Sequence, residues 1–246
     1  MNILITGASS GIGWALAEKY ASEDCNLFLA ARRTGLIEEK IKALKNVNAE
    51  VKIIENDVSR KESVNKAFNE CGNIDLAILN AGYGETLTPE TFNSEAAEKT
   101  LGANIYGMIY WIEKILPGMI ENGKGTIAGI SSLADSKGFS GSGLYCASKA
   151  AASVFLQGLR LDLKSYGIKV ITVKPGFVKT PMTDQNDFKM PFLMESEKAA
   201  KIIKKGIEKG KVTIKFPMPT SILIGLVNLM PDKIFEFLLS RPAKNQ

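Results

Sequence analysis

A tyrosine and a lysine four residues apart, Tyr145 and Lys149, are the pair best suited to moving a proton in this sequence. On a helix, residues at this spacing share one face about one turn apart. A phenol has an unaided pKa of about 10, and a neighbouring ammonium lowers that pKa by favouring the phenolate. The chain contains no histidine, which excludes imidazole acid–base chemistry, histidine-dependent triads and histidine-bearing zinc sites. We therefore expect a tyrosine acid or base supported by a lysine, with no metal.

A glycine-rich loop follows the first apolar run and leads into a pattern of helical spacing. It reads Thr6-Gly7-Ala8-Ser9-Ser10-Gly11-Ile12-Gly13. Free backbone N–H groups and the positive end of a helix dipole attract phosphate at such a place, and glycines let the backbone approach a pyrophosphate closely. The alternative is a tight turn without a ligand. We expect a dinucleotide site that includes Gly7, Ser9, Ser10, Gly11, Ile12 and Gly13.

Two arginines stand where a dinucleotide site places the residue that binds the adenosine ribose. In NAD sites an acid about 20 residues beyond the glycine loop binds the ribose 2′-OH. Here the second apolar run leads into Arg32 and Arg33, with no acid at that place. Guanidinium groups bind phosphate in a fork geometry, so the pair favours NADP(H) over NAD(H). The alternative is a solvated arginine pair in a loop.

The elements that position these residues alternate along the chain. Short apolar runs rich in β-branched residues predict strands at residues 2–6, 26–30, 50–55, 76–79, 125–130, 169–173 and 212–215. Helical spacing predicts helices at residues 12–22, 36–44, 60–70, 96–121, 145–166 and 197–209. This alternation predicts an α/β fold of the Rossmann type: a doubly wound, seven-stranded parallel sheet with helices on both faces.

Further residues complete a set of motifs in a fixed order. Asp57-Val58 follows the third predicted strand, and Asn80-Ala81-Gly82 follows the fourth. Ser131-Ser132 follows the fifth, and Pro175-Gly176 with Thr180 follows the sixth. Asn104 lies in a predicted helix, and Tyr145-Cys-Ala-Ser-Lys149 begins another. Together with the glycine loop, this ordered set resembles the short-chain dehydrogenase/reductase family, in its type of roughly 250 residues. The resemblance runs through nearly the whole chain.

The resemblance implies an oxidoreductase that moves a hydride between nicotinamide and a carbonyl or alcohol, with Tyr145 exchanging the proton. It also implies that Lys149 holds the nicotinamide ribose, that Ser132 hydrogen-bonds the reacting oxygen, and that Asn104 supports a water that relays protons to the lysine. The residues alone leave two alternatives open. Ser132 could be a turn or helix-capping serine, and Asn104 a polar helix residue bonded to backbone.

The resemblance also assigns the remaining cofactor positions. Asp57 and Val58 would bracket the adenine, although Asp57 could instead cap the following helix. Residues that would line the adenosine ribose are Asn80, Ala81 and Gly82. Residues that would frame the nicotinamide are Pro175, Gly176, Val178 and Thr180, together with Tyr145 and Lys149. Many family members that use NADP carry a basic residue just before the second glycine of the loop, where this chain has Ser10.

The substrate is indicated only by an apolar segment after the sixth predicted strand, which contains Met182, Phe188, Met190, Phe192, Leu193 and Met194. Flexible sulfur and aromatic side chains suit an adaptable pocket or lid for an apolar or amphipathic carbonyl or alcohol. Packing on the core or on a partner subunit is the alternative. Two other functions are also considered. A non-catalytic NADP sensor predicts a broken tyrosine–lysine pair, and a sugar-nucleotide epimerase or dehydratase predicts G-x-x-G-x-x-G and a longer chain.

Composition bounds the class of protein. The 246-residue chain is 45% hydrophobic and 23% charged, which suits one domain with a large core. We expect residues 1–215 to form the nucleotide-binding catalytic domain and residues 216–246 a helical extension of it. The net charge of +5 is scattered, which argues against nucleic acid as a partner. Three widely spaced cysteines and an N-terminus without signal-peptide features favour a cytoplasmic location.

The helix that begins at Tyr145 and the C-terminal extension each predict a binding partner. The resemblance implies that the helix beginning at Tyr145 pairs with its twin across a two-fold axis, which gives a homodimer or homotetramer. The extension has apolar residues at helical spacing on both sides of Pro231, which predicts two short helices. These helices could cap the substrate cleft, cover a subunit surface, or lie on a membrane surface with the help of nearby basic residues.

Overall fold

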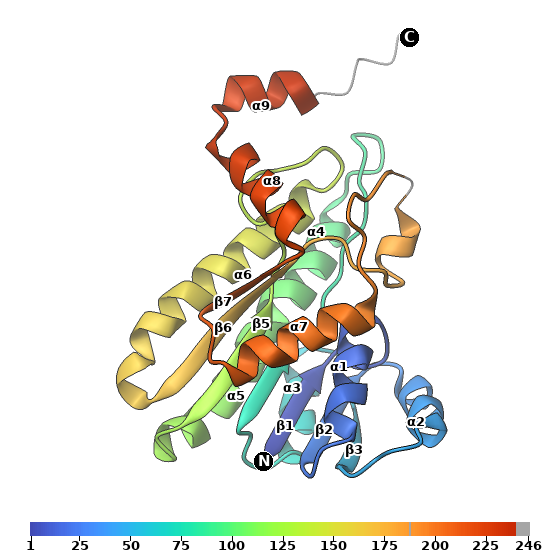
Figure 1. The fold of residues 1–246 in the computed structure, drawn as a ribbon, viewed down its shortest axis with the longest axis vertical. Coiled ribbons are helices and arrows are strands. Elements are labelled where there is room, and N and C mark those ends of the chain that lie inside the picture. The colour runs from blue at the N-terminus through green and yellow to red at the C-terminus, as the bar shows by residue number, and fades with distance from the viewer. Residues whose placement is uncertain (187, 240–246) are drawn as a thin grey trace.

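The computed structural model describes residues 1–186 and 188–239, and a seven-stranded parallel sheet runs through its centre (Figure 1). The strands are β1 (Asn2–Thr6), β2 (Asn26–Ala31), β3 (Glu50–Glu55), β4 (Leu76–Leu79), β5 (Gly125–Ile130), β6 (Ile168–Pro175) and β7 (Thr213–Phe216). Their order across the sheet is β3-β2-β1-β4-β5-β6-β7. The predicted fold class is confirmed.

The order of the strands reverses between β1 and β4, which pair directly with each other. The chain leaves β1 toward β2 on one side and leaves β4 toward β5 on the other. The loops that follow these two strands therefore part, and a crevice opens at the carboxyl edge of the sheet, where ligands of open α/β sheets bind.

Helices cover both faces of the sheet and make two separate cores. On one face α1 (Gly11–Ala21), α2 (Thr34–Ala43) and α7 (Ser196–Glu208) pack on strand residues such as Ile3, Ile5 and Leu29. On the other face α3 (Lys61–Asn69), α5 (Gly107–Glu121) and α6 (Gly143–Asp162) pack on Leu4 and Ile127. Strands buried on both faces explain the continuous apolar runs in the sequence.

The predicted helix at residues 96–121 is interrupted. It consists of α4 (Ser94–Leu101), a π-helical turn at Gly102–Tyr106, and α5. The Gly107 N–H donates to the Gly102 carbonyl, which closes the wide turn. Hydrophobic spacing could not reveal the extra residue, because both flanking helices keep their own periodicity. Two short 3₁₀ turns, Lys164–Tyr166 and Thr183–Gln185, lie elsewhere in the chain.

The chain ends in a C-terminal arm, the name used below for α8 (Met218–Leu229) and α9 (Asp232–Leu239), which extends beyond the carboxyl edge of the sheet (Figure 1). Both predicted tail helices are thus present. Phe216, which the sequence assigned to the tail, ends β7 and is buried. Many apolar side chains of the arm are exposed, including Ile222 and Leu226. Within residues 1–186 and 188–239, no helix has the length and apolar character needed to cross a bilayer.

Candidate active site at the carboxyl edge of the sheet

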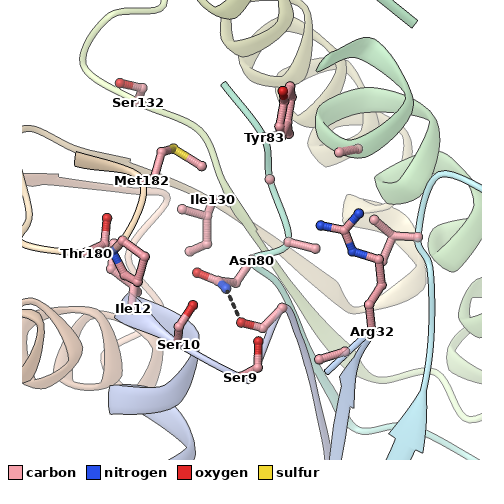
Figure 2. A pocket seen from close by; sticks show the side chains of 18 of the residues that line it. Ser9, Ser10, Ile12, Arg32, Asn80, Tyr83, Ile130, Ser132, Thr180 and Met182 are labelled. Carbon is pink, nitrogen blue, oxygen red and sulfur yellow. Dashed lines mark hydrogen bonds between the residues drawn. The ribbon is translucent and has the colours of Figure 1, made fainter. Parts of the chain in front are cut away.

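A cavity of about 540 Å³ occupies the crevice between the loops after β1 and β4. Figure 2 shows Ser9, Ser10 and Ile12 on one side of it and Tyr83 and Arg32 on another, with Ser132 and Met182 beyond. Of the predicted site residues, all but two line it; those that do are Gly7, Ser9, Ser10, Gly11, Ile12, Arg32, Arg33, Asp57, Val58, Asn80, Ala81, Gly82, Ser132, Tyr145, Lys149, Pro175, Gly176, Val178 and Thr180. The two exceptions are Gly13 and Asn104, which lie behind its wall.

The glycine loop is packed so closely that a Cβ at Gly7 or Gly13 would overlap backbone atoms. Gly7 has a φ of +66°, and a Cβ there would lie 2.8 Å from the Ala81 Cα. A Cβ at Gly13 would overlap the Gly7 carbonyl oxygen. The absence of a side chain at Gly13 therefore lets the first turn of α1 pack directly against the loop.

The loops after β1 and β4 are joined by Thr6 and Asn80. The Thr6 hydroxyl accepts hydrogen bonds from the backbone N–H groups of Asn80 and Ala81, at 3.0 and 3.1 Å. The Asn80 amide donates back to the Thr6 and Gly7 carbonyls, at 3.0 and 3.3 Å; Figure 2 draws one bond from Asn80 as a dashed line. These bonds fix the width of the crevice at its floor.

Positive charge gathers at the end of the cavity near β2. Arg32 and Arg33 line it there, and Arg33 donates to the Ser10 hydroxyl at 3.3 Å. Arg60 and Lys99 line the cavity as well. The sequence analysis missed these two because they follow other strands and only the fold brings them to the cavity that the arginine pair lines.

Asp57 is engaged by its own loop. Its carboxylate accepts from the Ser59 backbone N–H at 3.1 Å and from the Ser59 hydroxyl at 2.7 Å, and Arg60 lies 3.9 Å from its other oxygen. The predicted capping alternative is wrong, because the N-cap residue of α3 is Arg60 and the Asp57 carboxylate bonds within its own loop, where it borders the cavity.

Tyr145 and Lys149 lie on one face of α6, as their spacing predicts. The Lys149 ammonium is 5.7 Å from the centre of the Tyr145 ring. It is buried and donates to the Ile130 carbonyl at 3.0 Å. The Ser132 hydroxyl, two residues beyond β5, lies close enough to the Tyr145 phenol to lower its pKa. Three residues from two different elements thus meet at one point of the cavity wall.

Burial shapes the protonation of this group. Loss of solvent disfavours the phenolate and raises the pKa of Tyr145, while the hydrogen bond from Ser132 acts in the opposite direction. The same loss of solvent disfavours the ammonium and lowers the pKa of Lys149 to about 8. The lysine therefore remains mainly charged at neutral pH.

Asn104 lies in the π-helical turn and is buried behind the cavity wall. Its side-chain oxygen accepts from the Tyr83 N–H and its amide donates to the Tyr83 carbonyl, both at 2.8 Å. It also donates to the Ser148 hydroxyl at 2.8 Å, and Ser148 donates to the Tyr145 carbonyl. The Asn104 side chain therefore joins the loop after β4 to the start of α6. This matches the alternative of a helix residue bonded to backbone.

Of the predicted apolar segment, Met182 lines the cavity. Met194 instead packs against the core, and Phe188 lies on Phe177 with ring centres 5.9 Å apart. Tyr83 lines the cavity although the sequence analysis did not single it out. Its hydroxyl donates to Glu85 at 2.6 Å, and no motif signals that contact.

The C-terminal arm contacts the segment between Ser132 and Tyr145. Lys137 donates to the Met230 carbonyl at 3.2 Å, forms an ion pair with Asp232, and lies over the Phe235 ring. The Phe139 and Phe235 rings meet edge to face, 5.8 Å between centres. The arm is thus attached beside the reactive end of the cavity.

Comparisons with known proteins agree with this geometry. A family model described as short chain dehydrogenase matches residues 1–190. An uncharacterized oxidoreductase of Myxococcus xanthus is 33% identical over 237 residues, which cover 95% of this chain and 94% of that protein. A short chain dehydrogenase from Burkholderia cenocepacia in complex with NADP has a TM-score of 0.82 at 24% identity, covering 98% of this chain and 97% of that one. A short chain dehydrogenase/reductase from Burkholderia phymatum in complex with NAD has a TM-score of 0.79 at 22% identity, covering 99% and 97%.

The sheet, the cavity and these matches define a single class of protein, an oxidoreductase with a nicotinamide cofactor. The chain belongs to the short-chain dehydrogenase family, and the resemblance noted in the sequence is confirmed.

Proposed function

We propose that this protein is an NADP-dependent oxidoreductase that moves a hydride between nicotinamide and a carbonyl or alcohol, with Tyr145 as general acid and base. One observation carries the proposal. The Tyr145 phenol, the Lys149 ammonium and the Ser132 hydroxyl converge on the wall of the same cavity whose other end is formed by the glycine loop and Arg32.

The residues present fit a dinucleotide. Glycines keep side chains out of the space where the backbone has to approach a pyrophosphate; a Cβ at Gly11 would lie 2.8 Å from Thr180. The cationic end of the cavity suits a 2′-phosphate, and Arg32 and Arg33 are the residues proposed to hold it. Of the two solved structures compared above, one is a complex with NADP and the other a complex with NAD, so the proposed preference for NADP depends on these side chains.

The bound cofactor supplies or accepts the hydride. The protein's own residues handle the proton at the substrate oxygen. Tyr145 Oη gives the proton when a carbonyl is reduced and removes it when an alcohol is oxidised. The buried Lys149 ammonium favours the phenolate electrostatically. Ser132 orients the reacting oxygen toward Tyr145, and its hydrogen bond also lowers the Tyr145 pKa.

The proposed substrate is apolar or amphipathic. Met182 and Tyr83 line the cavity, and the arm beside it exposes apolar side chains. These surroundings favour a hydrophobic body with one oxygen function over a highly charged molecule.

We propose that the protein assembles with itself. The outer face of α6 exposes Val154 and Leu161, at 69% and 73%, and apolar side chains exposed on one helix face suit a twin helix across a two-fold axis. For the arm, packing against the protein's own cleft or subunits is favoured over a membrane surface, because Asp232 and Glu236 would oppose anionic lipid.

The test begins with a scan of carbonyl compounds for oxidation of NADPH, followed by Tyr145→Phe on the best substrate. Turnover is expected to fall by roughly 10²-fold or more, while NADPH still binds. Tyr166→Phe, at an exposed tyrosine in the 3₁₀ turn that follows α6, is the matched control. Near-normal turnover in Tyr145→Phe would refute the assigned role. Binding of NADPH without turnover of any carbonyl or alcohol would instead indicate a sensor.

A further inference from the structure

An ion pair with a buried carboxylate and a partly buried ammonium lies behind the segment that follows Ser132. The Asp135 carboxylate, with its side chain 4% exposed, is 2.6 Å from the Lys174 ammonium. Asp135 is three residues beyond Ser132, and Lys174 is the residue of β6 directly before Pro175 and Gly176, which line the cavity. The pair therefore joins the segment after β5 to the end of β6 at the cavity wall.

Hydrogen bonds extend this pair to α6. The Ser153 hydroxyl lies within hydrogen-bond distance of the Asp135 carboxylate and 2.8 Å from the Ser131 hydroxyl. Ser131 in turn donates to the Lys149 backbone carbonyl at 2.9 Å. A chain of polar contacts thus runs from Lys174 on β6, through Asp135, to the turn of α6 that carries Lys149.

Backbone hydrogen bonds fix the residues on both sides of Ser132. The Ser131 N–H donates to the Val173 carbonyl at 2.7 Å, and the Leu133 N–H donates to the Pro175 carbonyl at 2.8 Å. The Ala134 N–H donates to the Ser132 hydroxyl itself at 3.1 Å. Asp135 is the next residue, so the ion pair fixes the segment at the point where backbone pairing with β6 ends.

Stability alone is a weak reason for such a pair. Removing a carboxylate and an ammonium from water carries a large desolvation penalty, and well-packed apolar residues of similar volume often stabilise a protein equally well or better. Apolar packing is not directional, whereas a charged pair with hydrogen bonds fixes the relative position of the groups that it joins. Here those groups are the three segments that carry Ser132, Lys149 and the Pro175–Gly176 wall.

We propose that Asp135 and Lys174 are positioning residues, which hold the Ser132 hydroxyl against Tyr145 from behind the cavity. This inference depends on the function proposed above for Tyr145. Neither side chain lines the cavity, so both act through Ser132 and not on a bound molecule.

The test compares Asp135→Asn, Lys174→Met, Lys174→Arg and the double variant D135N/K174M. The matched control is E23Q/K204M, which removes the ion pair between Lys204 of α7 and Glu23 after α1, together with the Lys204–Glu208 pair within α7. Lys204 is 20% exposed, close to the 21% of Lys174. Measurements are kcat and KM for the substrate, the Kd for NADPH, the melting temperature, and hydrogen exchange of the peptide that contains Ser132.

We expect Asp135→Asn and Lys174→Met to lower kcat by about tenfold, to leave the NADPH Kd within about twofold, and to accelerate exchange of that peptide. Lys174→Arg keeps the cation and should retain most of kcat. The double variant leaves no unpaired buried charge, so it should regain thermal stability while kcat stays low. The control should lose stability without loss of kcat.

Full kcat in the double variant would overturn the proposal. A fall in kcat that merely parallels the fall in melting temperature in every variant, including the control, would overturn it as well. Tyr145→Phe is measured in parallel. If it keeps normal turnover, the proposed function fails; if it loses turnover while D135N/K174M does not, only the positioning role fails.

Discussion

The backbone of Gly84 lies against the ring of Tyr145. A Cβ at residue 84 would come within 2.7 Å of the Tyr145 Cδ2 atom, closer than any ordinary carbon contact. The Ser132 hydroxyl interacts with the phenol of the same side chain. The position of the Tyr145 phenol therefore depends on the absence of a side chain at Gly84.

Gly84→Ala is expected to displace the phenol without unfolding the protein. Turnover should fall by about tenfold, because a misplaced proton donor is less effective, while NADPH affinity stays within about twofold. Gly138→Ala is the matched control, since a Cβ there meets no atom within 4 Å. Equal kcat values for the two variants would show that the contact has no influence on the reaction.

Arg32→Ala tests the cofactor preference. A charge-assisted contact with a 2′-phosphate would be lost, so KM for NADPH should rise by roughly ten- to hundredfold. NADH lacks the phosphate, so its KM should not change, which provides an internal control. Arg33→Ala is expected to have a smaller effect, because its guanidinium also bonds Ser10. Equal use of both cofactors by the unmodified protein would contradict the prediction.

Lys149 should make stability depend on pH. Burial lowers its pKa to about 8 from an ordinary value of 10.5. Between these values the unfolded chain holds a proton that the folded chain has released, so the free energy of unfolding rises with pH. The raised pKa of Tyr145 acts in the opposite direction above a pH of about 10. Relative to Lys149→Met, the unmodified protein should gain about 2 kcal/mol from pH 8 to pH 10. Urea unfolding across this range measures the difference, and a constant difference would show that the buried amine does not titrate there.

Assembly is tested on the outer face of α6. Val154→Glu and Leu161→Glu place charge on residues that a twin helix would cover, so each should convert a dimer or tetramer to monomers. Val212→Glu, at an apolar position 57% exposed before β7, should leave the mass unchanged. Light scattering at micromolar concentration gives the mass, and an unmodified protein that is already monomeric would contradict the prediction.

The C-terminal arm is tested with Ile222→Glu and Leu226→Glu, again with Val212→Glu as control. Cutting the chain at Lys215 would remove the buried end of β7, so substitutions are the better test. If the arm packs on the cleft or on a subunit, these variants should alter turnover or mass, and the unmodified protein should stay in solution with anionic liposomes. Sedimentation of the unmodified protein with those liposomes, lost in the variants, would favour the membrane surface instead.

The sequence predicts those features that depend on local spacing. The glycine loop and the pair formed by Tyr145 and Lys149 are such features, because each motif lies within one loop or one turn of a helix. Contacts between distant segments are different. Asp135 and Lys174 meet only because β5 and β6 pair in one particular register. Arg60 and Tyr83 line the cavity because the sheet brings the segments after β3 and β4 to the same edge. No local pattern in the sequence identifies these two residues.

The π-helical turn makes this part of the protein sensitive to the number of residues and not only to their identity. Successive residues of an α-helix lie about 100° apart around its axis, and the turn at Gly102–Tyr106 is closed by a bond that spans five residues. Deleting any one residue there would rotate α5 against α4 by about 100°, or turn Asn104 away from Tyr83. A substitution in this turn alters a single side chain, whereas a deletion changes which side of an entire helix faces the sheet. Insertions and deletions should therefore be rarer than substitutions in this turn among functional variants of the chain.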